Sequence, residues 1–192
     1  MFKAFVTLAA LCALSASASA AQLSFLHVQG RDMVNEAGQK VHLRGTGLGH
    51  WLLPEAYMWK LGNGADRPRK AEALIEKLIG KPKKEAFFKL YTDRYITAAD
   101  IQRIRELGFN SVRPALNARL LMDEATGQLI PEGFKRIDDL IGWCKAQGLY
   151  VILDLHGAPG GQTGKNIDDS PRDQPELFTS EKFAERCERL WV

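Results

Sequence analysis

Apolar positions along the chain follow two different periods, and their order predicts alternating helices and strands. Helical spacing, with apolar residues three and four positions apart, is found in 71–79, 85–91, 97–108, 131–147 and the stretch after Ser180. Within the third segment, Thr97 and Asp100 have the spacing of a capping box, and Gly108 is a typical residue for the helix end. Gly148 ends the fourth segment in the same way. These segments are therefore expected to be helices.

Short apolar runs between these segments have the character of strands. Strands are predicted at 41–45, 109–114 and 149–156, and a hairpin around residues 35–38 precedes the first of them. The third run is almost continuously apolar, which is typical of a strand buried on both faces of a parallel sheet. Strands that alternate with helices in this order fit either an open doubly wound α/β sheet or a (β/α)₈ barrel. No G-x-G-x-x-G motif opens the first helix, so the dinucleotide-binding signature is missing.

Polar residues interrupt the apolar runs close to where the predicted strands end. Side chains alternate along a strand, so Ile152, Asp154 and His156 share one face. Arg113 is the last residue of the preceding predicted strand, just before Pro114. In (β/α)₈ enzymes the carboxyl ends of the strands carry the chemistry. The barrel explains these positions, and it makes Arg113 and His156 candidate active-site residues.

Other roles for these polar residues remain open at this point. Asp154 is expected to be a structural carboxylate, satisfying loop amides or the Arg113 guanidinium, rather than a catalytic one. His156 could be hydrogen bonded without touching a substrate. The two side chains could also form a metal pair, but a metal site needs at least three protein ligands, and no other histidine pairs with a carboxylate at ligand spacing. No metal and no cofactor are therefore expected.

The stretch 157–179 after the third predicted strand has no clear regular pattern. Loops of this length are uncommon in a compact domain unless they bind or cover something. Gly160, Gly161 and Gly164 would allow close approach of the backbone. The loop therefore supports a functional site at this end of the strands.

Composition and charge exclude several classes of partner. The chain is 45% apolar and 26% charged with a formal net charge of +3, which is too small to indicate binding of nucleic acid or of an anionic membrane. Residues 1–20 have the pattern of a secretory signal peptide, with Lys3, a short apolar core and Ala18-Ser19-Ala20 as the cleavage site. The mature part, 21–192, is expected to be secreted, either extracellular or periplasmic, with no membrane attachment after cleavage. Its Cys144 and Cys187 could pair or remain free thiols, and neither has a companion for zinc.

Three ordered motifs resemble glycoside hydrolase family 5, in particular its cellulase and exo-1,3-β-glucanase-like members. They are VHLRGTGLGHWLLPEAYMW (41–59), YITAADIQRIRELGFNSVRP (95–114) and GLYVILDLHGAPGGQTGKNIDDSP (148–171). The resemblance runs from about residue 25 to the end of the chain. It implies a (β/α)₈ barrel, of which the N-terminal hairpin and the first three strand–helix units are present. It also implies hydrolysis of β-linked glucans or related polysaccharides and oligosaccharides with retention of configuration.

The resemblance assigns roles to individual residues. Arg113 corresponds to the arginine that supports the nucleophile, and His156 to the histidine that lines the subsite of the cleaved sugar. Glu55 resembles the glutamate that hydrogen-bonds the hydroxyls of that sugar. Trp51 is expected in core or rim packing, with a stacking role left open.

The sequence departs from the family pattern in the first of these motifs. The usual RGVNLGGW has Gly47 here in place of asparagine and His50 in place of glycine. Because of these two departures, the geometry beside the first strand is not expected to match that of the family. The substrate of the relatives therefore does not transfer directly to this chain.

Retaining glycosidases need two carboxylates about 5–5.5 Å apart. In the family these are glutamates at the ends of strands four and seven, the first within Asn-Glu-Pro, a motif that this sequence lacks. Its single Asn-Glu pair, Asn35-Glu36, falls in the predicted hairpin turn.

Both catalytic glutamates are therefore expected beyond Val192, and the chain is expected to be the N-terminal part of a longer enzyme, inactive alone. The alternatives are a non-catalytic carbohydrate-binding relic of such a barrel and a metal-dependent barrel hydrolase.

Overall fold

The computed structural model describes residues 23–165 and 168–192, so the predicted signal peptide lies outside the described residues. The strands are β1 (His27–Gln29), β2 (Asp32–Val34), β3 (Gly45–Leu48), β4 (Ser111–Asn117), β5 (Tyr150–Val151) and β6 (Asp154–Gly157). The helices are α1 (Pro68–Ile79), α2 (Lys81–Tyr95), α3 (Ala98–Glu106), α4 (Ala118–Leu121), α5 (Pro131–Gln147) and α6 (Glu181–Arg189), with 3₁₀ turns η1 (Asn63–Ala65) and η2 (Glu176–Phe178).

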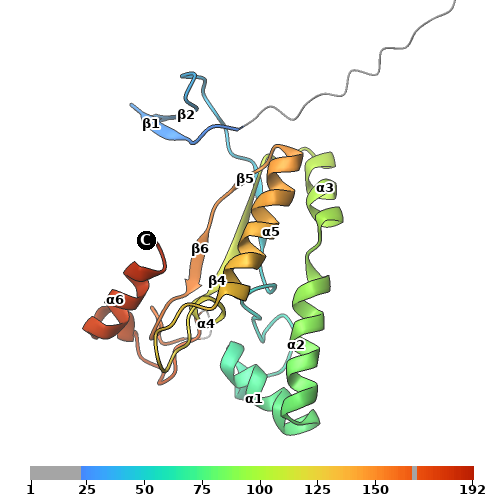
Figure 1. Cartoon of the computed structure of the whole chain (residues 1–192), viewed down its shortest axis with the longest axis vertical. Helices are drawn as coiled ribbons and strands as arrows, with labels where there is room; N and C mark the ends of the chain where they lie inside the picture. The colour runs from blue at the N-terminus through green and yellow to red at the C-terminus, as the bar shows by residue number, and fades with distance from the viewer. Residues whose placement is uncertain (1–22, 166–167) are drawn as a thin grey trace, which may run out of the picture.

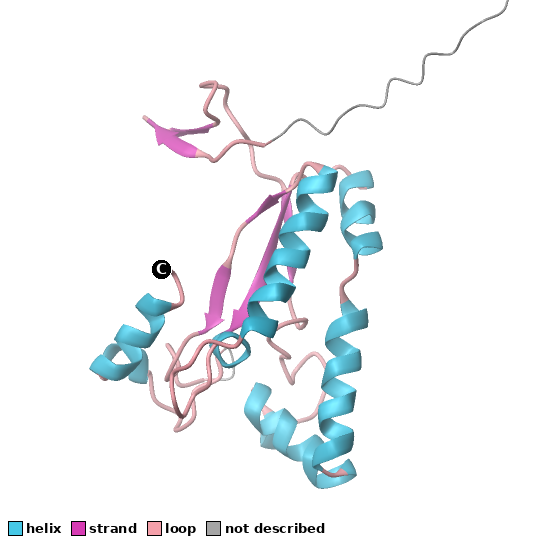
Figure 2. Ribbon diagram, viewed as in Figure 1, coloured by secondary structure: helices cyan, strands magenta, loops and turns pink. Residues whose placement is uncertain are grey.

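The strands from β3 onward form one parallel layer. β4 is central, with β3 on one side and β5 and β6, one after the other, on its other side. The register sets Gly47 beside Arg113 and Ala115 beside Asp154. The helices α1–α3 connect β3 to β4, and α4 and α5 connect β4 to β5, as the alternating pattern predicts. Figure 2 shows the long helices beside the strands. The parallel order β3–β4–β5 is that of successive strand–helix units in a (β/α)₈ barrel.

The first barrel strand begins later than the sequence pattern predicts. The prediction of a strand at 41–45 is wrong, because β3 covers Gly45–Leu48. Before it, the Asn110 side chain accepts from the Arg44 N–H at 2.7 Å and donates to the His42 carbonyl at 2.8 Å. The Asn110 backbone N–H also donates to the Arg44 carbonyl at 2.9 Å, so these bonds join the two segments just before the ladder. The ladder starts at Gly45, where a Cβ would lie 2.4 Å from the Ser111 Oγ, so only glycine allows the two strands to approach.

The other strand boundaries also differ from the prediction. β4 continues past Pro114 to Asn117, so Arg113 is an interior residue of the strand and the prediction that it ends the strand is wrong. Pro114 is tolerated because it pairs with Leu48, the last residue of β3, where the ladder between the two strands stops. The predicted third strand is interrupted at Ile152 and Leu153, which are both exposed.

The predicted hairpin around residues 35–38 forms, and another antiparallel hairpin precedes it. β1 and β2 pair in antiparallel fashion with Gln29 opposite Asp32, so the turn lies at Gly30 and Arg31. Residues 35–38 form a second turn, which brings Lys40 back to bridge Val34. Figure 1 shows the hairpin at one end of the sheet and α4 at the opposite end, where β4 and β6 finish.

The helices follow their local signals closely. The Asp100 carboxylate accepts from the Thr97 backbone N–H at 2.8 Å, and this capping box begins α3. α5 covers Pro131–Gln147 as predicted and ends at Gly148 in the left-handed conformation. α2 is longer than its predicted 85–91 and begins immediately after Gly80. No helix among the described residues is both long and apolar enough to cross a membrane.

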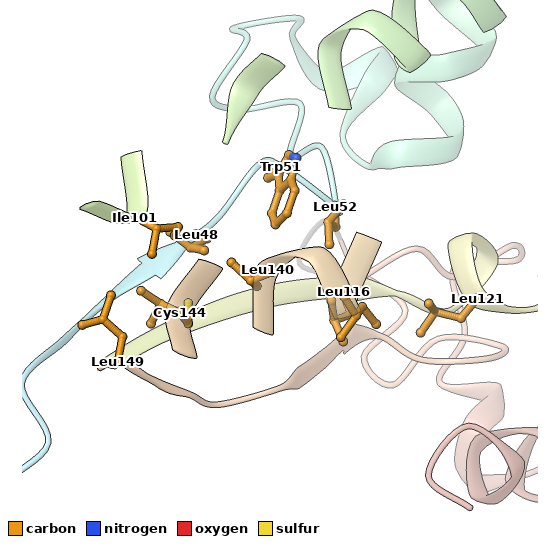
Figure 3. Packing of buried hydrophobic residues seen from close by; sticks show 11 residues of the cluster. Leu48, Trp51, Leu52, Ile101, Leu116, Leu121, Leu140, Cys144 and Leu149 are labelled. Atoms are coloured by element: carbon orange, nitrogen blue, oxygen red, sulfur yellow. The ribbon is translucent and has the colours of Figure 1, made fainter. Parts of the chain in front are cut away.

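A single large cluster of apolar side chains joins the sheet to α3 and α5 (Figure 3). Ile101, Val112, Leu140 and Cys144 are fully buried in it. Each large apolar side chain buried there stabilises the fold by about 1.5–3 kcal/mol. Burial also raises the pKa of the Cys144 thiol to about 12, and both Cys144 and Cys187 are free thiols.

Candidate functional site

Four of the five predicted site residues lie in one row of neighbouring polar side chains. The Arg113 Nη1 donates to the Asp154 Oδ2 at 2.7 Å. The same carboxylate oxygen lies 3.1 Å from the His156 Nδ1. The His156 Nε2 in turn faces the Glu55 Oε1 at 3.8 Å. Side chains from β4, β6 and the loop after β3 therefore meet at one place.

The strand register explains this row. Ala115 pairs with Asp154, which places Asp154 beside β4 on the same face as Arg113, and His156 follows two residues later on that face. The alternating residues Val151 and Leu155 pack against the apolar cluster on the other face. The single carboxylate of Asp154 thus orients both the guanidinium and the imidazole.

The gap between His156 and Glu55 is suited to a ligand hydroxyl. At 3.8 Å the Nε2–Oε1 separation is too long for a direct hydrogen bond. Both side chains are partly exposed, at 28% and 12%. A hydroxyl between them could bond to both atoms.

Tyr57 is a site residue that the sequence reasoning missed. Its hydroxyl donates to the Glu55 Oε2 at 2.8 Å, and this hydrogen bond raises the pKa of the Tyr57 phenol. The ring itself is 61% exposed. Its spacing, Glu55-x-Tyr57, was the available signal, but an exposed aromatic residue in a loop has no periodicity that would mark it.

A cavity of about 590 Å³ opens over this row. Its walls come from β3 and the loop after it, from the end of α2 and from β4 and β6. The lining residues are Gly47, Leu48, Gly49, Glu55, Tyr57, Met58, Tyr95, Ile96, Arg113, Ala115 and His156. Gly47, one of the departures from the family pattern, leaves this space open: among the described residues, a Cβ there would meet only the Arg113 Nη2, 3.9 Å away.

Trp51 lies apart from this cavity. It is 2% exposed within the apolar cluster, and its Nε1–H donates to the Thr92 carbonyl at 2.8 Å. Of the roles left open by the sequence, core packing matches this position. The buried ring offers no face for sugar stacking, so the substrate-binding role given to Trp51 does not fit.

The loop after β6 is fastened by two buried aspartates. The Asp169 carboxylate accepts from the Asn117 side chain at 2.9 Å, from the Arg69 backbone N–H at 2.9 Å and from the Arg119 guanidinium. Asp169 and Glu72 outweigh the opposing effect of burial and hold the pKa of Arg119 above its ordinary value. These contacts tie the loop to α1 and to the end of β4.

Asp168 holds the inside of the same loop together. Its carboxylate accepts backbone N–H bonds from Thr163, Gly164 and Ser170 at 2.6–2.9 Å. Burial alone would raise the pKa of Asp168, but these hydrogen bonds outweigh it and lower the pKa. Both aspartates are at most 3% exposed, and their carboxylates are engaged in holding the loop.

Among residues 23–165 and 168–192, no three His, Cys, Asp or Glu side chains are arranged to hold a metal ion. The pair formed by Asp154 and His156 therefore finds no third ligand within that part of the chain. Its partners are instead Arg113 and Glu55.

Comparison with known proteins decides the family. A model described as Cellulase (glycosyl hydrolase family 5) matches residues 76–190. The chain belongs to glycosyl hydrolase family 5. The resemblance seen in its sequence motifs is thereby confirmed.

Curated relatives and solved structures agree with this membership. A β-xylosidase of Phanerodontia chrysosporium is 33% identical over 170 residues, which are 88% of this chain and 35% of the relative. A probable glucan 1,3-β-glucosidase A of Aspergillus clavatus is 35% identical over 160 residues, 79% of this chain and 36% of the relative. The chain thus spans about a third of the length of these relatives.

A crystal structure of rutinosidase from Aspergillus niger superposes with a TM-score of 0.59 at 22% identity, covering 74% of this chain and 40% of that one. This similarity is one of fold. The described residues form the hairpin and the first strand–helix units of a (β/α)₈ barrel.

Proposed function

We propose that this chain belongs to a secreted glycoside hydrolase that cleaves β-linked glucans or related oligosaccharides with retention of configuration. The observation that carries the proposal is the row from Arg113 through Asp154 and His156 to Glu55. It lies on the sheet face that looks into a barrel, beside an open cavity, in a member of glycosyl hydrolase family 5.

Each residue of the row has a role in the proposed site. Arg113, held by Asp154, presents a fixed guanidinium that supports a nearby carboxylate nucleophile through charge-assisted hydrogen bonds. His156 and Glu55 bind the hydroxyls of the sugar whose bond is cleaved. Tyr57 holds the Glu55 carboxylate and adds an exposed aromatic surface beside it. These are hydrogen-bonding and aromatic contacts of the kind that a neutral pyranose requires.

The two catalytic carboxylates are proposed to be glutamates from a part of the protein that follows Val192. One protonates the leaving oxygen and the other attacks the anomeric carbon, about 5–5.5 Å away from the first. The carboxylates of the row itself are already committed, since Asp154 bonds to Arg113 and Glu55 accepts from Tyr57.

The test is an assay of the natural gene product on β-1,3-, β-1,6- and β-1,4-glucan oligosaccharides and on xylo-oligosaccharides, with an α-glucan as control. Proton NMR of the first products reports the anomer. We expect cleavage of at least one β-glycan with the β anomer released first, and no cleavage of the α-glucan. Release of the α anomer would overturn retention. Binding of β-glycans without any cleavage would establish the non-catalytic carbohydrate-binding protein instead.

A further inference from the structure

His50 has an unusual position between the proposed sugar site and α2. It is 2% exposed and adopts a φ of 66°. This left-handed conformation costs a residue with a Cβ about 1–2 kcal/mol, whereas glycine, the residue of the family pattern here, adopts it freely. A histidine at this position therefore makes contacts that offset its backbone cost.

The imidazole is bonded directly to the segment that carries Glu55. The His50 Nδ1 accepts from the Glu55 backbone N–H at 2.7 Å. An accepting Nδ1 has no proton, so the neutral ring carries its proton on Nε2. Burial lowers the pKa of His50 and outweighs the opposing effect of the nearby Glu55 charge, which keeps the ring in this neutral form.

The rest of the ring is enclosed by aromatic side chains. Within the part of the chain that the structure describes, the Nε2 has no hydrogen-bond partner. Trp59 lies edge-on at 4.6 Å between ring centroids, and Tyr91 and Tyr95 of α2 lie at 6.0 and 5.8 Å. The Tyr91 hydroxyl also donates to the His50 carbonyl at 2.6 Å. The ring is therefore held in one orientation from the side of α2.

We propose that His50 is a positioning residue, which fixes the Glu55 main chain and thereby the Glu55 carboxylate at the sugar site. The inference rests on the proposed role of Glu55 in binding sugar. The Glu55 side chain accepts from Tyr57 and faces His156, and the Glu55 backbone N–H donates to His50. The aromatic residues around His50 therefore support the cavity wall through a single imidazole.

Two substitutions distinguish the effect of the acceptor nitrogen from the effect of the volume of the ring. His50→Phe keeps an aromatic ring but removes the acceptor, and it adds a backbone cost because phenylalanine enters the left-handed region less readily than histidine. His50→Asn loses the ring, keeps an acceptor oxygen and tolerates the left-handed conformation. If the nitrogen positions Glu55, the Phe variant is impaired and the Asn variant recovers function. If His50 only fills space, the order is reversed.

The first measurement does not depend on sugar. Ring ¹⁵N spectra of the natural gene product, labelled at histidine, identify His50 as the signal lost in His50→Phe. We expect the Nε2–H tautomer, and we expect His50→Phe to speed hydrogen exchange of the Glu55 amide at least tenfold. An Nδ1–H tautomer, or unchanged exchange, overturns the contact whether or not the protein hydrolyses glycans.

The second measurement connects the contact to the site. Relative to the wild type, we expect His50→Phe to raise KM for a β-glucan oligosaccharide at least fivefold with a smaller change in kcat, and His50→Asn to restore most of the difference. Glu55→Gln gives the reference for losing the sugar contact. A His50→Phe enzyme with normal KM beside an impaired Glu55→Gln enzyme refutes the positioning role. A wild type without cleavage or binding refutes the proposed function, and the spectra then decide the contact alone.

Discussion

The Arg113 guanidinium and the Asp154 carboxylate lie 2.7 Å apart although 41 residues separate them along the chain. The pair joins two adjacent strands, and Asp154 also contacts His156. Because the Arg113 side chain is 52% exposed, such an ion pair contributes little to folding stability. The value of the pair is the orientation it gives to the side chains that face the cavity.

This relationship predicts that substitutions in the pair affect activity far more than stability. Lysine cannot reproduce the planar fork of arginine. We expect Arg113→Lys to lower kcat/KM for β-glucan cleavage about 100-fold, the scale of a small misplacement at a reacting centre. Asp154→Asn should cause a smaller loss, because it frees the guanidinium without removing it.

Steady-state kinetics and thermal unfolding of the two variants check this prediction. The melting temperatures are expected to stay close to that of the wild type. A large drop in melting temperature with unchanged kinetics would show that the pair is structural only.

For Asp169 we expect the opposite, namely that its substitution lowers folding stability. Its buried carboxylate accepts hydrogen bonds from the Arg119 guanidinium and from the Arg69 backbone N–H. Removal of one partner from a buried ion pair leaves the charge of the other uncompensated. Arg119 keeps Glu72 as a partner, so we expect Asp169→Asn to cost about 3 kcal/mol, the lower end for such pairs. The matched control is Asp139→Asn, which breaks the exposed pair with Lys135 and should leave stability nearly unchanged. Equal unfolding curves for the two variants would contradict the assignment.

Asp168 predicts a dependence of stability on pH. Its pKa is lowered in the folded protein, so its contribution is fully present above the ordinary value of about 3.9 and is lost as pH falls through the lower folded value. Asp168→Asn removes this contribution and places an amide opposite three N–H donors. The variant should be less stable than the wild type at pH 7, and the difference should shrink towards pH 2. Thermal unfolding measured from pH 7 to pH 2 checks it, and a constant difference would rule it out.

The parts of this fold that could be predicted from the sequence are those set by local signals. The α5 boundaries follow from Pro131 at its start and Gly148 at its end, and those residues act without distant partners. The start of β3 does not follow from such signals, because it depends on contacts with Asn110 and Ser111, far along the chain. Strand boundaries depend on partners that no local window contains.

The candidate site divides in the same way. Asp154 and His156 were recognisable because strand alternation puts them on one face. Arg113 was recognised from its place near the end of the preceding predicted strand, although β4 continues to Asn117. Tyr57 and the buried ring of Trp51 were not, since both lie in the loop after β3, where no periodicity indicates which side chains face the cavity and which the core. The role of His50 depends on an acceptor contact to a backbone N–H, which a sequence cannot display.

Two glycines of α5 give a matched pair of stability predictions. A Cβ at Gly133 would lie 1.9 Å from the Leu120 carbonyl oxygen, so alanine there must push α5 away from the end of α4. A Cβ at Gly142 meets nothing within 4 Å, and alanine is favoured over glycine within a helix by about 1 kcal/mol. We expect Gly142→Ala to raise the free energy of unfolding by up to about 1 kcal/mol. Gly133→Ala should lower it by about 1–3 kcal/mol, as overpacking does.

Urea unfolding of both variants measures the change in the free energy of unfolding. This change is expected to be positive for Gly142→Ala and negative for Gly133→Ala. The same propensity gain applies to both positions, so any difference between them reports the contact between α5 and Leu120. If Gly133→Ala were also stabilising, the close approach of α5 to the chain at Leu120 would be wrong. The placement of α5 against the end of β4 and α4 would then need revision.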